Sequence, residues 1–173
     1  MADTAGGRGL VLDTSVWINL LATGAAEAII AALAQTCYAP EPVAAELKRD
    51  PITGELYTRS THPLWKMEPH VAVVALDRIE LEFFLGLVGA STIDALGDGE
   101  AASIAVAARR GLDLVLDDRK ARRIVRERFG EVQLHWTVDL LRAPAVITGL
   151  GEMRATVCFE NARRHGRMHI PKN

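Results

Sequence analysis

Acidic residues stand at four separate places where a strand or a helix is expected to begin or end. They are Asp13, Glu46, Glu100 and the adjacent pair Asp117 and Asp118. The first and the last places directly follow short apolar runs that are typical of buried strands. Carboxylates gathered from distant parts of a chain repel one another unless a cation lies among them, and hard oxygen ligands suit Mg²⁺ or Mn²⁺. These positions therefore predict a metal-dependent site.

The elements that must position these acids alternate between strand and helix. The last stretch, residues 136–164, reads as helical. Strand patterns cover residues 9–12, 37–39, 71–74, 113–116 and 132–134, and helical patterns cover residues 14–23, 25–35, 41–49, 77–88, 100–110 and 119–129. This alternation predicts an α/β fold, a three-layer sandwich around a central, mainly parallel sheet. Because the carboxyl ends of parallel strands line the ligand crevice, the acids after the strands are expected at one edge of the sheet.

Each acid taken alone also has a simpler explanation. Asp13 can cap the helix that follows it, as can Thr14 or Ser15. Asp98 favours capping of the next long helix, and Asp118 can cap the basic helix after it. Glu46 can be a solvated helix residue. These alternatives stay open at each position, and the combination of positions is what favours an acidic site.

The size and the charge of the chain indicate one domain with an unevenly distributed charge. The chain has 173 residues, of which 49% are hydrophobic and 24% charged, and its formal net charge is −2. This length suits a single domain, with a core over about residues 9–135 and a helical, basic extension over residues 136–173. Residues 119–128 carry six basic side chains and one acid. A basic face beside an acidic crevice is therefore expected.

Other features of the sequence suggest a cytoplasmic protein. Cys37 and Cys158 lack metal-ligand spacing, so each is expected as a buried thiol. The N-terminus shows no secretory signal pattern. Residues 71–90 are apolar in patches but carry four charges, which argues against a membrane span. Residues 50–69 contain three prolines and are expected to form a loop or a small hairpin that contacts substrate.

The motifs resemble those of the PIN domain, the nuclease fold of VapC-type toxins. The stretch Leu12-Asp13-Thr14-Ser15-Val16-Trp17 resembles the family's first strand end, and Pro42-Val43-Ala44-Ala45-Glu46 its second acidic position. Gly99-Glu100-Ala101 is similar to a subgroup whose third acid opens a helix. Leu114-Val115-Leu116-Asp117-Asp118 resembles the fourth acidic position. Two departures are Glu100, where many members carry Asp, and Leu116, where Thr or Ser is common.

The resemblance implies a ribonuclease that depends on Mg²⁺ or Mn²⁺. Asp13, Glu46, Glu100 and Asp118 are then the expected catalytic ligands, with Asp117 as a neighbouring or water-mediated ligand. It also implies RNA as substrate, a homodimer, and a cognate antitoxin as partner.

Several other side chains are candidates for holding the RNA. Ser15 can bond a ligand or the scissile phosphate, and a row of basic residues follows the fourth acid. Trp65 can stack on a base, whereas core packing is the default expectation for Trp17. The basic row consists of Arg119, Lys120, Arg122 and Arg123, which are expected to hold the RNA backbone.

Two rival functions remain open at this point. A haloacid-dehalogenase-like phosphatase also begins with Asp after its first strand, but it needs a second Asp where this chain has Ser15. A non-catalytic PIN fold that binds RNA or an antitoxin is the other alternative. The presence of all four acids argues against such a degenerate scaffold, and a neighbouring antitoxin reading frame would favour the toxin.

Overall fold

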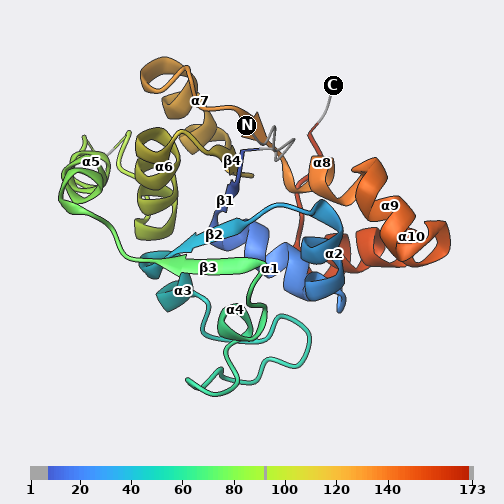
Figure 1. Cartoon of the computed structure of the whole chain (residues 1–173). Coiled ribbons are helices and arrows are strands. Elements are labelled where there is room, and N and C mark those ends of the chain that lie inside the picture. Colours follow the sequence, from blue (N-terminus) through green and yellow to red (C-terminus); the bar gives the residue numbers. More distant parts are fainter. Residues whose placement is uncertain (1–7, 92, 172–173) are drawn as a thin grey trace, which may run out of the picture.

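A five-stranded, all-parallel sheet forms the centre of the molecule (Figure 1). The computed structural model describes residues 8–91 and 93–171. The strand order is β3-β2-β1-β4-β5, and β1 pairs with both β2 and β4. The strands are β1 (Leu10–Leu12), β2 (Cys37–Pro40), β3 (Val71–Val74), β4 (Asp113–Val115) and β5 (Leu134–His135). The predicted α/β fold with a parallel sheet is therefore confirmed.

Ten α-helices and one short π-helix occur in the described part of the chain, close to the places that the sequence predicts. The predicted loop over residues 50–69 contains one helical turn and a single antiparallel bridge between Arg49 and Leu56. The helices are α1 (Thr14–Ala22), α2 (Ala26–Leu33), α3 (Glu41–Glu46), α4 (Pro63–Lys66), α5 (Arg78–Val88), α6 (Asp98–Arg110), α7 (Arg119–Arg128), α8 (Thr137–Leu141), α9 (Pro144–Leu150), α10 (Glu152–Asn161) and the π-helix η1 (Ala162–Gly166).

The helices form two layers because side chains of each strand alternate between the two faces of the sheet. Leu10 and Leu12 pack into the core shared with α1, α2 and the C-terminal helices. Val11, Leu114 and Leu116 pack into the opposite core, formed with α5, α6 and α7. In Figure 1, α5–α7 lie on one side of the strands and α1, α2 and α8–α10 on the other. The predicted three-layer sandwich is thus present.

Several predicted helix ends are shifted, and each shift has a local cause. Asp13, rather than Thr14 or Ser15, caps α1, since its side chain accepts the Ser15 N–H. Gly97 precedes α6, so Asp98 is the first helical residue and not the cap that was predicted. The predicted helix over residues 41–49 ends already at Glu46, because Leu47 leaves the helical conformation. The helix α6 ends at Gly111, whose φ of 63° lies in the left-handed region that glycine adopts readily.

The C-terminal segment folds back onto α1. A Cβ atom on Gly166 would lie 2.8 Å from the Asn19 Cα atom, so the chain can approach α1 this closely only with glycine. Ala162 and Met168 are buried on either side of that contact. Residues 162–168 are therefore fixed against the helix that begins at Asp13.

The buried cysteines and the helix lengths bear on two further expectations. Cys37 and Cys158 are both free and buried, as predicted. No single helix in residues 8–91 and 93–171 is long and apolar enough to cross a membrane, although α1 and α2 pass that test jointly as a pair bent by 115°. Both helices contribute buried residues to the core.

Candidate active site

The acidic positions meet at the switch point of the sheet. β1 runs between β2 and β4, and the chain continues outward from it in opposite directions on the two sides. In open parallel sheets, the crevice beyond the strand ends at such a point is the usual ligand site. Asp13 follows β1, and Asp117 and Asp118 follow β4 by two and three residues. The first turn of α6 adds Glu100.

Asp13 is a buried carboxylate with one oxygen used and one oxygen left over. Its side chain is 2% exposed, and its Oδ2 accepts hydrogen bonds from Ser15 N at 3.1 Å and Ser15 Oγ at 2.7 Å. Its Oδ1 is buried and has no partner in the described part of the chain. Burial raises the pKa of Asp13, the Ser15 bonds oppose this, and the charge of Glu46 adds to it. A buried, unpartnered carboxylate oxygen calls for an external cation or a donor.

Glu46 is held by α1 and α6 together. Its Oε2 accepts a hydrogen bond from Thr14 Oγ1, and its Oε1 accepts one from Gly99 N at 3.0 Å. A Cβ atom on Gly99 would overlap Glu46 Oε2 and Thr14 Oγ1. Glycine is therefore required at this position of α6 for the carboxylate to reach the helix. Both oxygens of Glu46 already serve the protein, and the residue closes α3 rather than opening it.

Glu100 carries the clearest electrostatic signature of the site. Burial and the negative charges of Asp13 and Asp118 raise its pKa from 4.5 to about 7. The Gly97 N–H, which donates to Glu100 Oε2 at 3.2 Å, and the Lys120 charge oppose this shift. A carboxyl whose ionisation is disfavoured by two neighbouring carboxylates marks a functional-site candidate.

Asp117 and Asp118 have different environments. Asp117 accepts hydrogen bonds from Asn19 Nδ2 at 2.9 Å, Thr137 N at 2.8 Å and Thr137 Oγ1 at 2.7 Å. Asp118 Oδ1 accepts the Ala121 N–H at 2.8 Å and so caps α7. Both oxygens of Asp117 tie the end of β4 to α1 and α8, and its expected metal role stays a prediction. Asp118 keeps one oxygen that makes no hydrogen bond within the described residues.

Glu100, Asp117 and Asp118 border a cavity of about 260 Å³. The cavity lies between the acids and the C-terminal segment, and it brings in residues that the sequence reading passed over. Asn19 had a signal in its position one helical turn after Ser15, whereas the C-terminal residues had none beyond their charge. Its lining consists of Ser15, Asn19, Glu100, Asp117, Asp118, Gly166, Arg167 and His169.

The donor set suits a hard divalent cation, although the side chains do not yet form a closed set of ligands. Among the described residues, no three His, Cys, Asp or Glu side chains are arranged to hold a metal ion. The hydrogen bonds above explain this, since they turn carboxylate oxygens toward protein donors. The unpartnered Asp13 oxygen and the mutual repulsion at Glu100 nevertheless fit a cation bound by oxygen ligands. Asp13, Glu100 and Asp118 each keep an oxygen that can hold it, and the ligand role expected for Glu46 stays a prediction.

The basic residues of α7 separate into exposed and internal side chains. Arg122 is only 3% exposed, donates to Leu116 O at 2.8 Å and His135 O at 2.7 Å, and stacks 3.7 Å above the Trp136 ring. Burial lowers its pKa to about 10. Arg122 thus ties α7 to the ends of β4 and β5, and its expected contact with RNA stays a prediction. The exposed Arg123 pairs instead with Asp94 and Glu127.

Arg119 and Lys120 lie nearest the acids. Lys120 Nζ donates to Ala95 O at 2.6 Å, and its charge lowers the pKa of Glu100. Arg119 Nη2 donates to His169 Nε2 at 3.0 Å. Both side chains thus stand where they can meet an anion that approaches the carboxylates.

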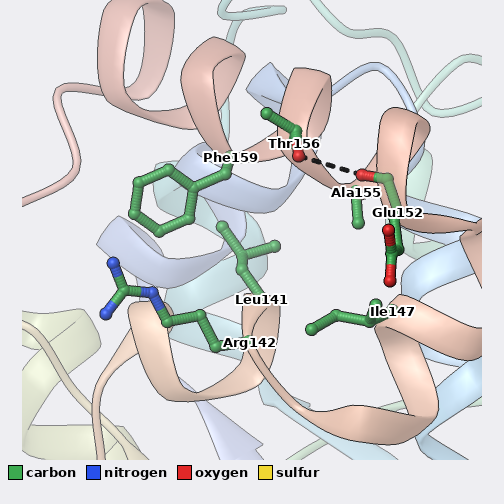
Figure 2. A pocket seen from close by; sticks show the side chains of 7 residues that line it. All are labelled: Leu141, Arg142, Ile147, Glu152, Ala155, Thr156 and Phe159. Carbon is green, nitrogen blue, oxygen red and sulfur yellow. Dashed lines mark hydrogen bonds between the residues drawn. The ribbon is translucent and has the colours of Figure 1, made fainter.

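Two further cavities lie away from these carboxylates. One, of about 410 Å³, lies between α8, α9 and α10 and shares no lining residue with the acidic cavity (Figure 2). The other, of about 740 Å³, lies between α3 and the loop of residues 50–69, where Trp65 is half exposed. Trp17 is fully buried, as expected.

Substitution of Asp117 and Asp118 by Asn should separate a structural carboxylate from an available one. Asp117→Asn replaces an acceptor of three hydrogen bonds and should cost about 1–3 kcal/mol, a fall in Tm of roughly 2–10 °C. Asp118→Asn keeps a good helix cap and removes a charge that faces Glu100. Its Tm should stay unchanged or rise slightly. Thermal unfolding without metal measures both, and a larger loss for Asp118→Asn would refute the assignment.

Comparison with known families gives one match. The sequence profile of a family described as a PIN domain matches residues 9–142, more than half of the chain. No curated protein matches the chain. The matched range contains the sheet and all the acids of the cavity. PIN domains are generally nucleases and typically use divalent metal ions. This chain belongs to the PIN-domain family.

Proposed function

We propose that the chain is a metal-dependent endoribonuclease that hydrolyses RNA phosphodiester bonds with Mg²⁺ or Mn²⁺. The observation that carries this proposal is the meeting of Asp13, Glu100 and Asp118 at the switch point, with a buried Asp13 oxygen left unpartnered. None of the three forms an ion pair with a described residue. An uncompensated cluster of this kind is suited to a cation, and PIN-family membership supports nuclease chemistry.

The proposal gives each acid a distinct part. Asp13, Glu100 and Asp118 would contact the cation, each through an oxygen that the protein does not use. Glu46 accepts hydrogen bonds with both of its oxygens, so it would act on the site through its negative charge, which raises the pKa of Asp13. Asp117 would hold the end of β4 in place, and Ser15 would orient the Asp13 carboxylate.

The chemistry follows from these positions. A divalent cation bound there supplies Lewis acidity, which lowers the pKa of a water molecule and neutralises charge on the leaving oxygen. Glu100, with a pKa of about 7 before a cation binds, can hold or release a proton near neutral pH. The exposed Arg119 and the half-buried Lys120 would bind the phosphate backbone and offset its repulsion from the acids.

Cleavage of a labelled structured RNA by the purified chain is the direct test. The wild type should cut with Mg²⁺ or Mn²⁺ and should stop in EDTA. Asp13→Asn and Glu100→Gln should each lower kcat by at least roughly 100-fold, because ligand or supporting groups of a metal site typically cost this much. Glu152→Gln, at the unrelated cavity of Figure 2, is the matched control and should cut normally.

A folded wild-type chain that cuts none of several RNA classes would refute catalysis. That result would favour the non-catalytic alternative, a PIN fold that binds RNA or an antitoxin. The phosphatase alternative gains no support, since Ser15 stands where that family needs a second Asp and donates to Asp13 instead.

The pH dependence of stability tests the acidic cluster without any activity assay. The pKa of Glu100 is raised in the folded chain, so the folded state holds a proton that the unfolded state has already lost between pH 4.5 and about 7. The metal-free protein should therefore lose stability as the pH rises through this window. Mg²⁺ or Mn²⁺ should restore it most strongly above about pH 7, where Glu100 is ionised.

Glu100→Gln should remove this part of the pH dependence and most of the stabilisation by metal. Its metal-free Tm should equal or exceed that of the wild type above about pH 7. Exposed Glu82→Gln on α5 is the control and should follow the wild type. Equal pH profiles for Glu100→Gln and the wild type would argue against the cluster.

We further propose that the chain is the toxin of a type II toxin–antitoxin pair and acts as a homodimer. The exposed apolar side chains Leu81 and Leu85, one helical turn apart on α5, support a surface that a second copy covers. Light scattering should give the mass of a dimer, and Leu85→Glu should give a monomer. A monomeric wild type would contradict the dimer, and the lack of a neighbouring antitoxin reading frame would contradict the toxin role.

A further inference from the structure

The C-terminal segment, residues 162–171, reaches the acidic cavity although it lies beyond the PIN-domain match. That match ends at residue 142, whereas Gly166, Arg167 and His169 line the cavity together with Glu100 and Asp118. The segment is thus a part of this chain that the family assignment leaves without a role.

The segment is built into the fold rather than resting loosely on it. Gly166 packs against Asn19, where a Cβ atom would overlap the Asn19 side chain. Met168 is buried and its N–H donates to Ala162 O at 3.2 Å. Arg167 adopts the left-handed conformation, with φ 60°, between these two anchors. The positions of Arg167 and His169 are therefore set by packing on both sides.

The two polar side chains of the segment are exposed and differ from their neighbours in pairing. Arg163 is engaged by Glu160, whereas Arg167 forms no ion pair with any described residue. His169 Nε2 accepts a hydrogen bond from Arg119 Nη2 at 3.0 Å. Arg119 is in this way joined to the C-terminal segment.

A basic cavity of about 470 Å³ adjoins this pair. It is lined by Arg119, Arg122, Arg126, Trp136 and Pro171. Arg119 lines the basic cavity and His169 lines the acidic one, so their hydrogen bond stands between the two. A polyanion that follows the basic cavity toward the acids would pass Arg119 and His169, and Arg167 lines the acidic cavity beyond them.

We propose that the C-terminal segment completes the substrate site, with Arg167 and His169 binding a phosphate group of the RNA strand beside the acidic cluster. This inference rests on the proposed nuclease function. An autoinhibitory plug would be expected to pair its arginine with the carboxylates, and Arg167 makes no such pair within the described residues. An exposed, unpaired guanidinium held by buried neighbours is suited to phosphate recognition.

The test is RNA binding by full-length variants. An Asp13→Asn chain with Mg²⁺ allows equilibrium binding of a labelled single-stranded RNA to be measured without cleavage. Arg167→Gln with His169→Gln in that background should weaken binding roughly three- to tenfold and should flatten the salt dependence by about 0.7 in log–log slope per lost phosphate contact. Arg164→Gln, an exposed arginine of η1 outside both cavities, is the matched control and should bind normally.

Further readouts separate this role from a structural one. Arg167→Lys should keep most of the RNA binding. The Tm of all these variants should stay close to that of the parent. In the chain that retains Asp13 and cleaves RNA, the double substitution should raise KM more than it lowers kcat. Faster cleavage by the double variant would identify a plug and overturn the inference, as would unchanged binding and salt slope. If the parent binds no RNA, the proposed function and this inference both fail; if it binds and only the variants show no effect, the inference alone fails.

Discussion

Five carboxylates held at one edge of a sheet by neutral hydrogen-bond donors are the constraint on which the structure depends. No described residue forms an ion pair with any of them. Neutral donors hold them instead: hydroxyls of Thr14, Ser15 and Thr137, the amide of Asn19 and backbone N–H groups. Such donors fix the geometry of the acids but leave their charge in place. Burial, followed by the charges of Asp13 and Asp118, raises the pKa of Glu100, and a cation bound beside these carboxylates would be favoured.

The way in which oxygens are used divides the acids into two groups. Asp13 gives one oxygen to Ser15, Glu100 gives one to Gly97 and Asp118 gives one to Ala121, and each retains the other. Asp117 and Glu46 accept hydrogen bonds with both of their oxygens and connect elements that are distant in sequence. Asp117 connects the end of β4 with α1 and α8, and Glu46 connects α3 with α1 and α6. Residues of the second group keep those of the first in register. The acidic residue type alone does not reveal this division, because it depends on which donors the fold brings near.

The features predicted correctly from the sequence are those that depend on local residue patterns. Contacts between segments that are distant in sequence were not predicted. Strand-end acids and the Gly111 helix end follow from periodicity and conformational preference, and the structure has them in place. The three-residue strand β1 was readable because its apolar run ends at Asp13. The burial of Arg122 against Trp136 could not be predicted, because a basic helix face has the same sequence pattern whether it faces solvent or packs on an indole ring. The same holds for the fold-back of residues 162–168, which has no periodic signal.

The fold-back links the acidic cluster to a part of the chain outside the family match. Gly166 touches Asn19, Asn19 donates to Asp117, and Asp117 fixes the end of β4 directly before Asp118. Each contact in this series is close-packed or hydrogen-bonded and buried at least in part. The residue before Asp118 is thus held by contacts that extend to the C-terminal segment. The family match ends at residue 142, but the site extends beyond it, because Gly166, Arg167 and His169 line the acidic cavity.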